Sequence, residues 1–304
     1  MPNRYATEII KRLEKVSAIG VDYFTIFDDW LEMVNAALEA LPRHVEAAVK
    51  TRTLAEDTDE VKKLWERLRS RYHRPYCWEY FQQAFHILLE SADADDWDDT
   101  IGDVYMEMNI ANKRNGQFFT PYPIARLAAG LNNIEEMLYE HLTAAYLKSP
   151  YGVMHQAILG DRAAERIPQF VKEMGQGIVP LVVEHFEVIK VSDCACGSGV
   201  MLLAAAETTP RWALDWGLVQ FYGQDIDQTC VTMARINMML HGLNGYSIKL
   251  ALALTPDELK AVPEPYQKAY QEAQEAVEQG WTERVEEITA EVNSWKQMSM
   301  FNQM

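Results

Sequence analysis

The feature that most constrains this fold is a short apolar run that ends in an acid and leads directly into a glycine turn. The run is FEVIKVSD (residues 186–193), and the turn is CACGSG (residues 194–199). The run is β-branched and bounded, as buried strands are, while GVMLLAAAET (residues 199–208) predicts a helix. A second strand is predicted in GLVQFYGQDID (residues 217–227). Strand, glycine-bearing loop, helix and strand in this order predict the opening of a parallel, doubly wound α/β sheet.

The turn has the composition of a loop that a ligand approaches closely. In such sheets ligands bind beyond the carboxyl ends of the strands. Gly197 and Gly199 lack the Cβ atoms that would block this approach. Asp193 ends the first strand, and Asp225 ends the second, where its carboxylate could accept hydrogen bonds from both hydroxyls of a ribose. Since only two glycines of the dinucleotide fingerprint are present, we weigh an adenosine-containing ligand against a tight turn that binds nothing.

The segments ahead of this sheet are predicted to be helical. Four amphipathic runs within residues 1–109 predict a helical domain, in which Pro42 should interrupt the chain after the second run and Pro75 before the fourth. The acidic SADADDWDD (residues 91–99) predicts a solvated linker whose acids favour the start of the next helix. Residues 132–183 are again expected to be mostly helical.

Composition and charge limit the functions that the chain can carry. The sequence is 48% apolar, has no run of 18 apolar residues and has no signal-peptide core at its N-terminus, so we expect a folded cytoplasmic protein without a membrane span. Four cysteines do not form a disulfide framework, and no Cys or His pair completes a metal site with Cys194 and Cys196. A net charge of −17 opposes direct binding of nucleic acid and leads us to expect a partner subunit if the chain works on DNA.

Three stretches in this order resemble a known family. They are GQFFTP (residues 116–121), DCACGSG (residues 193–199) and YGQDID…MARINMMLHG (residues 222–242). Together they are similar to the modification subunit of type I restriction systems, an S-adenosylmethionine-dependent adenine-N6 DNA methyltransferase. The family's turn usually reads D-P-A-C-G-S-G, and here Cys194 replaces the proline. The resemblance implies a Rossmann-like methyltransferase fold behind a helical N-terminal domain, and DNA as substrate, reached through a specificity or other partner subunit.

The resemblance also implies roles for single residues. Phe119, Thr120 and Pro121 would cover the methionine end of the cofactor. Asp225 would hold the ribose, and Ile226 would pack on the adenine face. The residues that would line the cofactor are Asp193, Ala195, Cys196, Gly197 and Gly199.

The sequence departs from the family at the positions of catalysis. The family's N-P-P-F or N-P-P-Y loop, which grips a flipped-out adenine, does not occur anywhere in the chain. The nearest candidate is PEPY (residues 263–266), in which Glu264 would replace the Asn and Tyr266 the aromatic residue; a bend between helices is the competing interpretation. The family's acid at the end of strand three is also missing from IKLALALTP (residues 248–256).

We therefore expect three segments and two competing functions. The segments are a helical domain (1–109), a methyltransferase-like domain (110–255) with a helical insertion (131–183), and a polar helical tail (256–304). The first function is a cofactor-binding member of the DNA adenine-N6 methyltransferase family that is inactive alone, as half of a split enzyme completed by a partner chain. The second is a non-catalytic interaction or regulatory subunit. A methyltransferase for a small molecule or protein is a third interpretation, which GQFFTP ahead of the turn disfavours.

Overall fold

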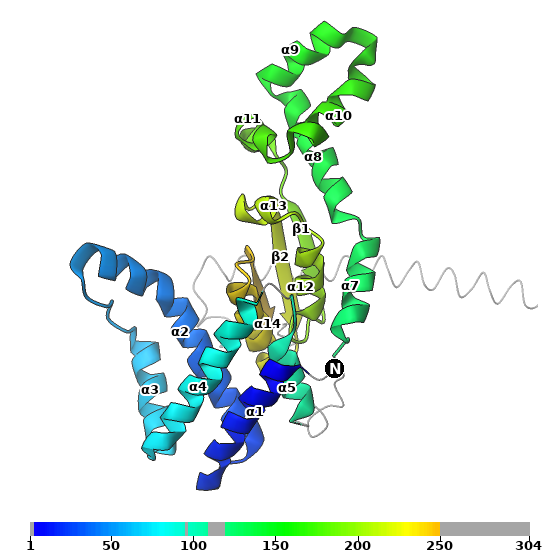
Figure 1. The fold of residues 1–304 in the computed structure, drawn as a ribbon. Coiled ribbons are helices and arrows are strands. Elements are labelled where there is room, and N and C mark those ends of the chain that lie inside the picture. The colour runs from blue at the N-terminus through cyan, green and yellow to red at the C-terminus, as the bar shows by residue number, and fades with distance from the viewer. Residues whose placement is uncertain (1–2, 95–96, 109–118, 250–304) are drawn as a thin grey trace, which may run out of the picture. The chain divides into compact units, whose positions relative to one another are not determined.

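The computed structural model describes residues 3–94, 97–108 and 119–249 of the chain. Within these residues the fold is mostly helical, with a small parallel sheet (Figure 1). The α-helices are α1 (Arg4–Val16), α2 (Tyr23–Thr51), α3 (Asp59–Arg71), α4 (Pro75–Ala92), α5 (Thr100–Glu107), α7 (Tyr122–Leu131), α8 (Ile134–Lys148), α9 (Pro150–Leu159), α10 (Ala163–Met174), α11 (Val179–Val182), α12 (Val200–Glu207), α13 (Arg211–Asp215) and α14 (Gln228–Leu240). The strands are β1 (Ile189–Asp193), β2 (Val219–Asp225) and β3 (Gly245–Lys249).

The N-terminal helices confirm the amphipathic pattern and correct one of its breaks. Asn3 and Asp22 accept backbone hydrogen bonds at the N-termini of α1 and α2, and Pro75 is the first residue of α4, where its missing N–H removes no helical bond. The expected interruption at Pro42 is wrong, because α2 continues through it to Thr51. Pro42 itself is exposed on the surface of α2.

The sheet confirms the predicted order of strands. β1 pairs with β2 and β2 with β3, all in parallel, and Asp193 lies opposite Gly223. β1 is shorter than the predicted run (residues 186–193), because pairing with β2 begins only at Ile189. β3 contains only the first two residues of the expected third strand, and the remainder of that stretch lies outside the described residues.

Helices α12 and α14 pack along the sheet and explain two sequence patterns. α12 is buried at six of its eight positions, which is why its sequence is apolar all round rather than amphipathic. α14 contributes to two cores: Ala234 and Met238 pack with the sheet, α12 and α7–α11, whereas Met233 packs with the N-terminal helices. Met233 and Met238 are therefore core residues, one in each of the two cores.

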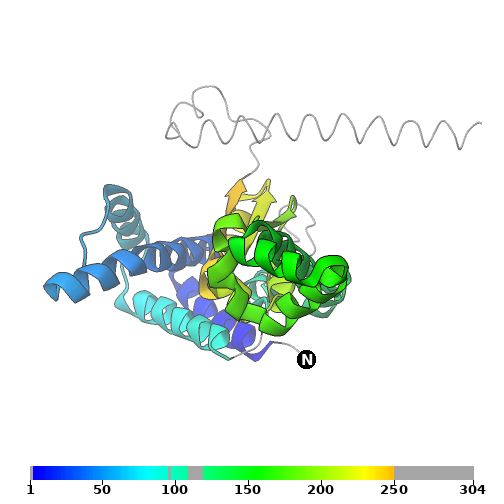
Figure 2. The same ribbon diagram turned by 90° about the horizontal axis from the view of Figure 1, so that it is seen from above.

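The helices predicted for residues 132–183, between GQFFTP and DCACGSG, are also present. α8, α9 and α10 pack against one another (Figures 1 and 2, green). α7 packs on α12 through Ala125 and Ala129. In the part of the chain that the structure describes, no helix has both the length and the apolar character needed to cross a membrane.

Candidate cofactor site

The candidate site lies at the carboxyl edge of β1 and β2. Because the two strands are parallel and in register, Asp193 and Asp225 end at the same edge of the sheet. Asp193 is half-buried, and its Oδ1 accepts a hydrogen bond from the Ala195 N–H at 3.0 Å, which starts the turn. The Cys196 N–H donates to the Gln224 carbonyl at 2.8 Å and so ties the turn to the end of β2.

The Asp225 carboxylate joins the two strand ends. Its Oδ2 accepts the Gly197 N–H at 2.9 Å, and its Oδ1 accepts the Asp227 N–H at 2.9 Å. Asp225 is only 8% exposed, while the neighbouring Ile226 is 54% exposed. A carboxylate has about four acceptor sites. One backbone donor on each oxygen therefore leaves acceptor capacity on both.

The structure shows why glycine is required at positions 197 and 199, and the reason differs from the one expected. Both adopt positive φ angles, +53° at Gly197 and +88° at Gly199, which favour glycine. A Cβ on Gly197 would lie 3.0 Å from the Phe119 ring, and a Cβ on Gly199 would lie 3.2 Å from Ala234 of α14. The Phe119 ring and Ala234 thus lie where a Cβ would point from Gly197 and from Gly199.

The structure brings Phe119 to the glycine turn across 78 residues of sequence. Its ring lies against Gly197 and stacks on Tyr105 of α5, with ring centroids 5.2 Å apart and planes 15° apart. Thr120 and Pro121 follow as exposed residues directly ahead of α7. Two separate stretches of the predicted site therefore meet at Phe119 and Gly197.

A buried network beneath the turn was missed by sequence reasoning. Asp99 is 5% exposed, which overturns the expectation of solvation for the last residue of the acidic segment. Its carboxylate accepts hydrogen bonds from the Ser198 hydroxyl, from Asn237 Nδ2 at 2.9 Å and from the Gly102 N–H at 2.9 Å. The last bond caps α5, as the acids were expected to do. The only sequence signal was this capping position, and it carries no information about Ser198 or Asn237.

Burial sets the protonation behaviour of the groups around the turn. It raises the pKa of Asp99, whose three partners are neutral donors, above the usual carboxyl range. Burial, followed by the charges of Asp225 and Asp193, raises the pKa of the Cys196 thiol to about 12. Cys196 is therefore neutral and packs beneath Gly223 rather than acting as a nucleophile. No cluster of His, Cys, Asp and Glu suited to a metal ion occurs among the described residues.

Glu264 and Tyr266, the candidate catalytic pair, are outside the described residues. A pocket of about 640 Å³ is lined by Trp97, Glu207, Arg211 and His241 among others. It lies where α12 and α14 end, whereas the glycine turn lies where α12 begins, so it is separate from the candidate site.

A parallel β–α–β unit with a glycine turn after its first strand and an acid at the end of its second defines the class of nucleotide-cofactor-binding α/β domains. Comparison with known families is consistent with this class. Residues 168–298 match the family model described as N-6 DNA Methylase. The chain therefore carries an N-6 DNA methylase family domain, which includes β1, the turn, α12, β2, α14 and β3. Phe119 and the N-terminal helices precede the matched residues, and no solved structure matches the chain.

Proposed function

We propose that the edge formed by Asp193, the glycine turn and Asp225 binds S-adenosylmethionine. The single observation that carries this proposal is the Asp225 carboxylate, which is fixed by two backbone N–H groups and retains acceptor capacity on both oxygens. A fixed carboxylate at the end of β2 is suited to accept hydrogen bonds from both ribose hydroxyls. The exposed Ile226 beside it offers an apolar face to the adenine. The family match supports the same ligand.

The other predicted residues have places in this proposal. Asp193, Ala195, Cys196, Gly197 and Gly199 would line the cofactor with backbone atoms and one carboxylate. No side chain caps the N-terminus of α12, whose N–H groups suit the carboxylate of the methionine part. Phe119, with Thr120 and Pro121 after it, would cover that end, and its position against Gly197 supports this role.

We further propose that the chain holds the cofactor but does not methylate adenine by itself. The observation behind this is the absence of Asn-Pro-Pro from the sequence. An extruded base must be held beside the methyl donor, and such positioning contributes roughly 7–11 kcal/mol to a rate. Glu264 is a weak substitute for the Asn, since a full charge in a closed pocket is costly to desolvate. A partner chain with the missing loop would make this a split enzyme; without one, the chain is a non-catalytic interaction subunit.

Calorimetric titration with S-adenosylmethionine tests cofactor binding. Asp225→Asn should weaken affinity at least tenfold, because hydrogen bonds to a charged acceptor contribute about 1.5–3 kcal/mol each. Asp215→Asn is the matched control, because Asp215 is an exposed aspartate of α13 that pairs with Arg211. Absence of binding to the unaltered protein at millimolar cofactor would refute the proposal. Equal affinity of the two variants would place the ribose elsewhere.

Transfer of labelled methyl groups to mixed-sequence DNA tests the second proposal. We expect no transfer above background and weak duplex binding at physiological salt, because the chain has a net charge of −17. Candidate partners supplied in the assay should restore DNA binding if a specificity subunit provides the phosphate contacts. Transfer by the chain alone that disappears in Tyr266→Ala would instead make PEPY the catalytic loop.

A further inference from the structure

We infer that Asp99 is a positioning residue, which fixes the glycine turn in the shape that binds the cofactor. This inference rests on the proposed function of the turn. Asp99 precedes the domain matched by the family model by 69 residues, and its carboxylate accepts hydrogen bonds from Ser198, Asn237 and Gly102. It would act through Ser198, the residue between the two glycines.

The contacts of Ser198 show how such an effect is transmitted. Its hydroxyl donates to Asp99 Oδ2, and its carbonyl accepts from Asn237 Nδ2 at 2.9 Å. The same Asn237 nitrogen donates to Asp99 Oδ1 at 2.9 Å, so Asp99, Ser198 and Asn237 form a closed triangle. Ser198 is completely buried, so the structure shows no solvent route to replacement partners.

The glycine turn is therefore held from two directions. Asp225 fixes the Gly197 N–H from the end of β2, and Asp99 with Asn237 fixes Ser198 from below. The two glycines on either side have positive φ angles, a conformation that needs fixed neighbours to persist in one shape. A cofactor that contacts the backbone of this turn gains affinity when the shape exists before binding.

Helix α5 supports both sides of the turn. Asp99 caps its N-terminus and holds Ser198, while Tyr105 in its second turn stacks on Phe119, which lies over Gly197. Ile101 and Val104 of α5 are buried in the core that the N-terminal helices form with α14. The N-terminal helical region thereby becomes part of the cofactor site without contacting the cofactor.

A carboxylate suits position 99 better than an amide does. All three partners are donors, so both oxygens of residue 99 must accept. An Asn side chain of nearly the same shape has one accepting oxygen, and its NH₂ group would face the donors on the other side. Asp99→Asn should therefore either release the pair formed by Asn237 and Gly102, or reverse the bond to Ser198, whose hydroxyl hydrogen then loses its acceptor.

Calorimetric titration of Asp99→Asn, Ser198→Ala and the double variant with S-adenosylmethionine tests the inference. We expect Asp99→Asn to weaken binding at least tenfold. Ser198→Ala should weaken it similarly, and the double variant no further, because both substitutions break one linkage. Asp29→Asn is the matched control: Asp29 of α2 is 4% exposed and accepts hydrogen bonds from Arg71 and Tyr72, so the substitution should lower the melting temperature without changing affinity.

The outcomes separate this inference from the proposed function. If the unaltered protein does not bind the cofactor, the proposed function fails. If it binds and Asp99→Asn has the same dissociation constant at a temperature where both are folded, Asp99 has only a structural role and the inference is overturned. Additive losses in the double variant would also overturn it. If Asp99→Asn does not fold, Ser198→Ala, which retains the carboxylate, decides the question by the same affinity measurement.

Discussion

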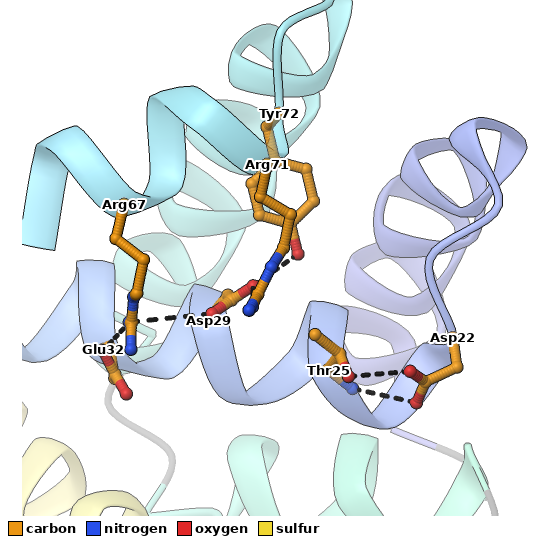
Figure 3. A network of polar contacts seen from close by, with 7 residues as sticks. All are labelled: Asp22, Thr25, Asp29, Glu32, Arg67, Arg71 and Tyr72. Atoms are coloured by element: carbon orange, nitrogen blue, oxygen red, sulfur yellow. Dashed lines mark hydrogen bonds and ion pairs between the residues drawn. The ribbon is translucent and has the colours of Figure 1, made fainter.

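Asp29 and Asp99 are buried to almost the same extent, at 4% and 5% exposure, but their surroundings are opposite in kind. Asp29 of α2 pairs with Arg71 at 2.5 Å and accepts a hydrogen bond from the Tyr72 hydroxyl at 2.6 Å (Figure 3). Arg67 lies 3.7 Å from its other oxygen and also pairs with Glu32. Asp99, in contrast, has three neutral donors around it.

The difference shows what each carboxylate contributes. At Asp29 the negative charge pairs with the positive charge of Arg71. The hydrogen bond that Arg71 donates to Asp29 raises the pKa of Arg71, so the network joins α2 to α3. Burial together with Asp29 raises the pKa of Tyr72 as well, which keeps its hydroxyl a donor. Among the described residues no cation pairs with Asp99, and burial raises the pKa of its carboxyl, so this arrangement fixes the shape of a turn instead of matching charges.

The largest loss of stability should come from removing the Asp29 carboxylate, which pairs with Arg71. Asp29→Ala leaves Arg71 and the buried Tyr72 hydroxyl without their partner and should lower the free energy of unfolding by about 3 kcal/mol, the lower end for a broken buried pair because Arg71 is partly exposed. Urea denaturation measures it. Glu32→Ala, which removes a partly exposed partner of Arg67, should cost under about 1 kcal/mol. Equal losses would mean that the α2–α3 network is no more than surface pairing.

Deleting one hydroxyl in each network sharpens the comparison directly. Ser198→Ala removes one of three neutral donors from a buried carboxylate and should cost about 2 kcal/mol of stability. Tyr72→Phe removes a donor from a carboxylate that Arg71 still neutralises, and should cost about 1 kcal/mol. Denaturation of both variants at pH 7 gives the two values. The reverse order would contradict the idea that neutral donors matter most where no cation is present.

The smallest expected effect is on the pH dependence of stability. Asp103 of α5 and Asp22 at the start of α2 should contribute to it with opposite signs. Burial, followed by the charge of Asp99, raises the pKa of Asp103 to about 6. The native state then keeps this proton longer than the unfolded chain, so Asp103 should lower stability as pH rises from about 4 to about 6. Hydrogen bonds from Thr25 lower the pKa of Asp22 at the start of α2 (Figure 3), so its contribution should be lost as pH falls through the carboxyl range.

Unfolding of Asp103→Asn and Asp22→Asn across pH 3 to 7 checks these signs. The first variant should lack the loss of stability between pH 4 and 6, and the second should lack the gain that accompanies ionisation of Asp22. Parallel pH profiles for both variants and the unaltered protein would show that neither carboxyl contributes as described.

Local patterns predicted much of the fold, because each depends on neighbours in the chain. Periodic apolar residues predicted the N-terminal helices, and the bounded β-branched runs predicted β1 and β2 in the right order. The prediction of a break at Pro42 was wrong because a proline inside a helical pattern can be accommodated within the helix, and the local pattern does not decide between the two outcomes. The domain limits at residues 109 and 255 and the cofactor roles stay predictions.

The sequence by itself determined the order of the elements, the glycine turn between acid-ended strands and the family of the domain over residues 168–298, since all of these are written in contiguous residues. Only the tertiary structure decided that Phe119 lies on Gly197, that Ala234 fills the space beside Gly199 and that Asp99 lies beneath Ser198. The physical reason is that each of these pairs joins segments at least 35 residues apart, which meet only once α5, α12 and α14 have packed. The polar segment around Asp99 predicts a solvated acid, and only the fold buries this carboxylate among three donors.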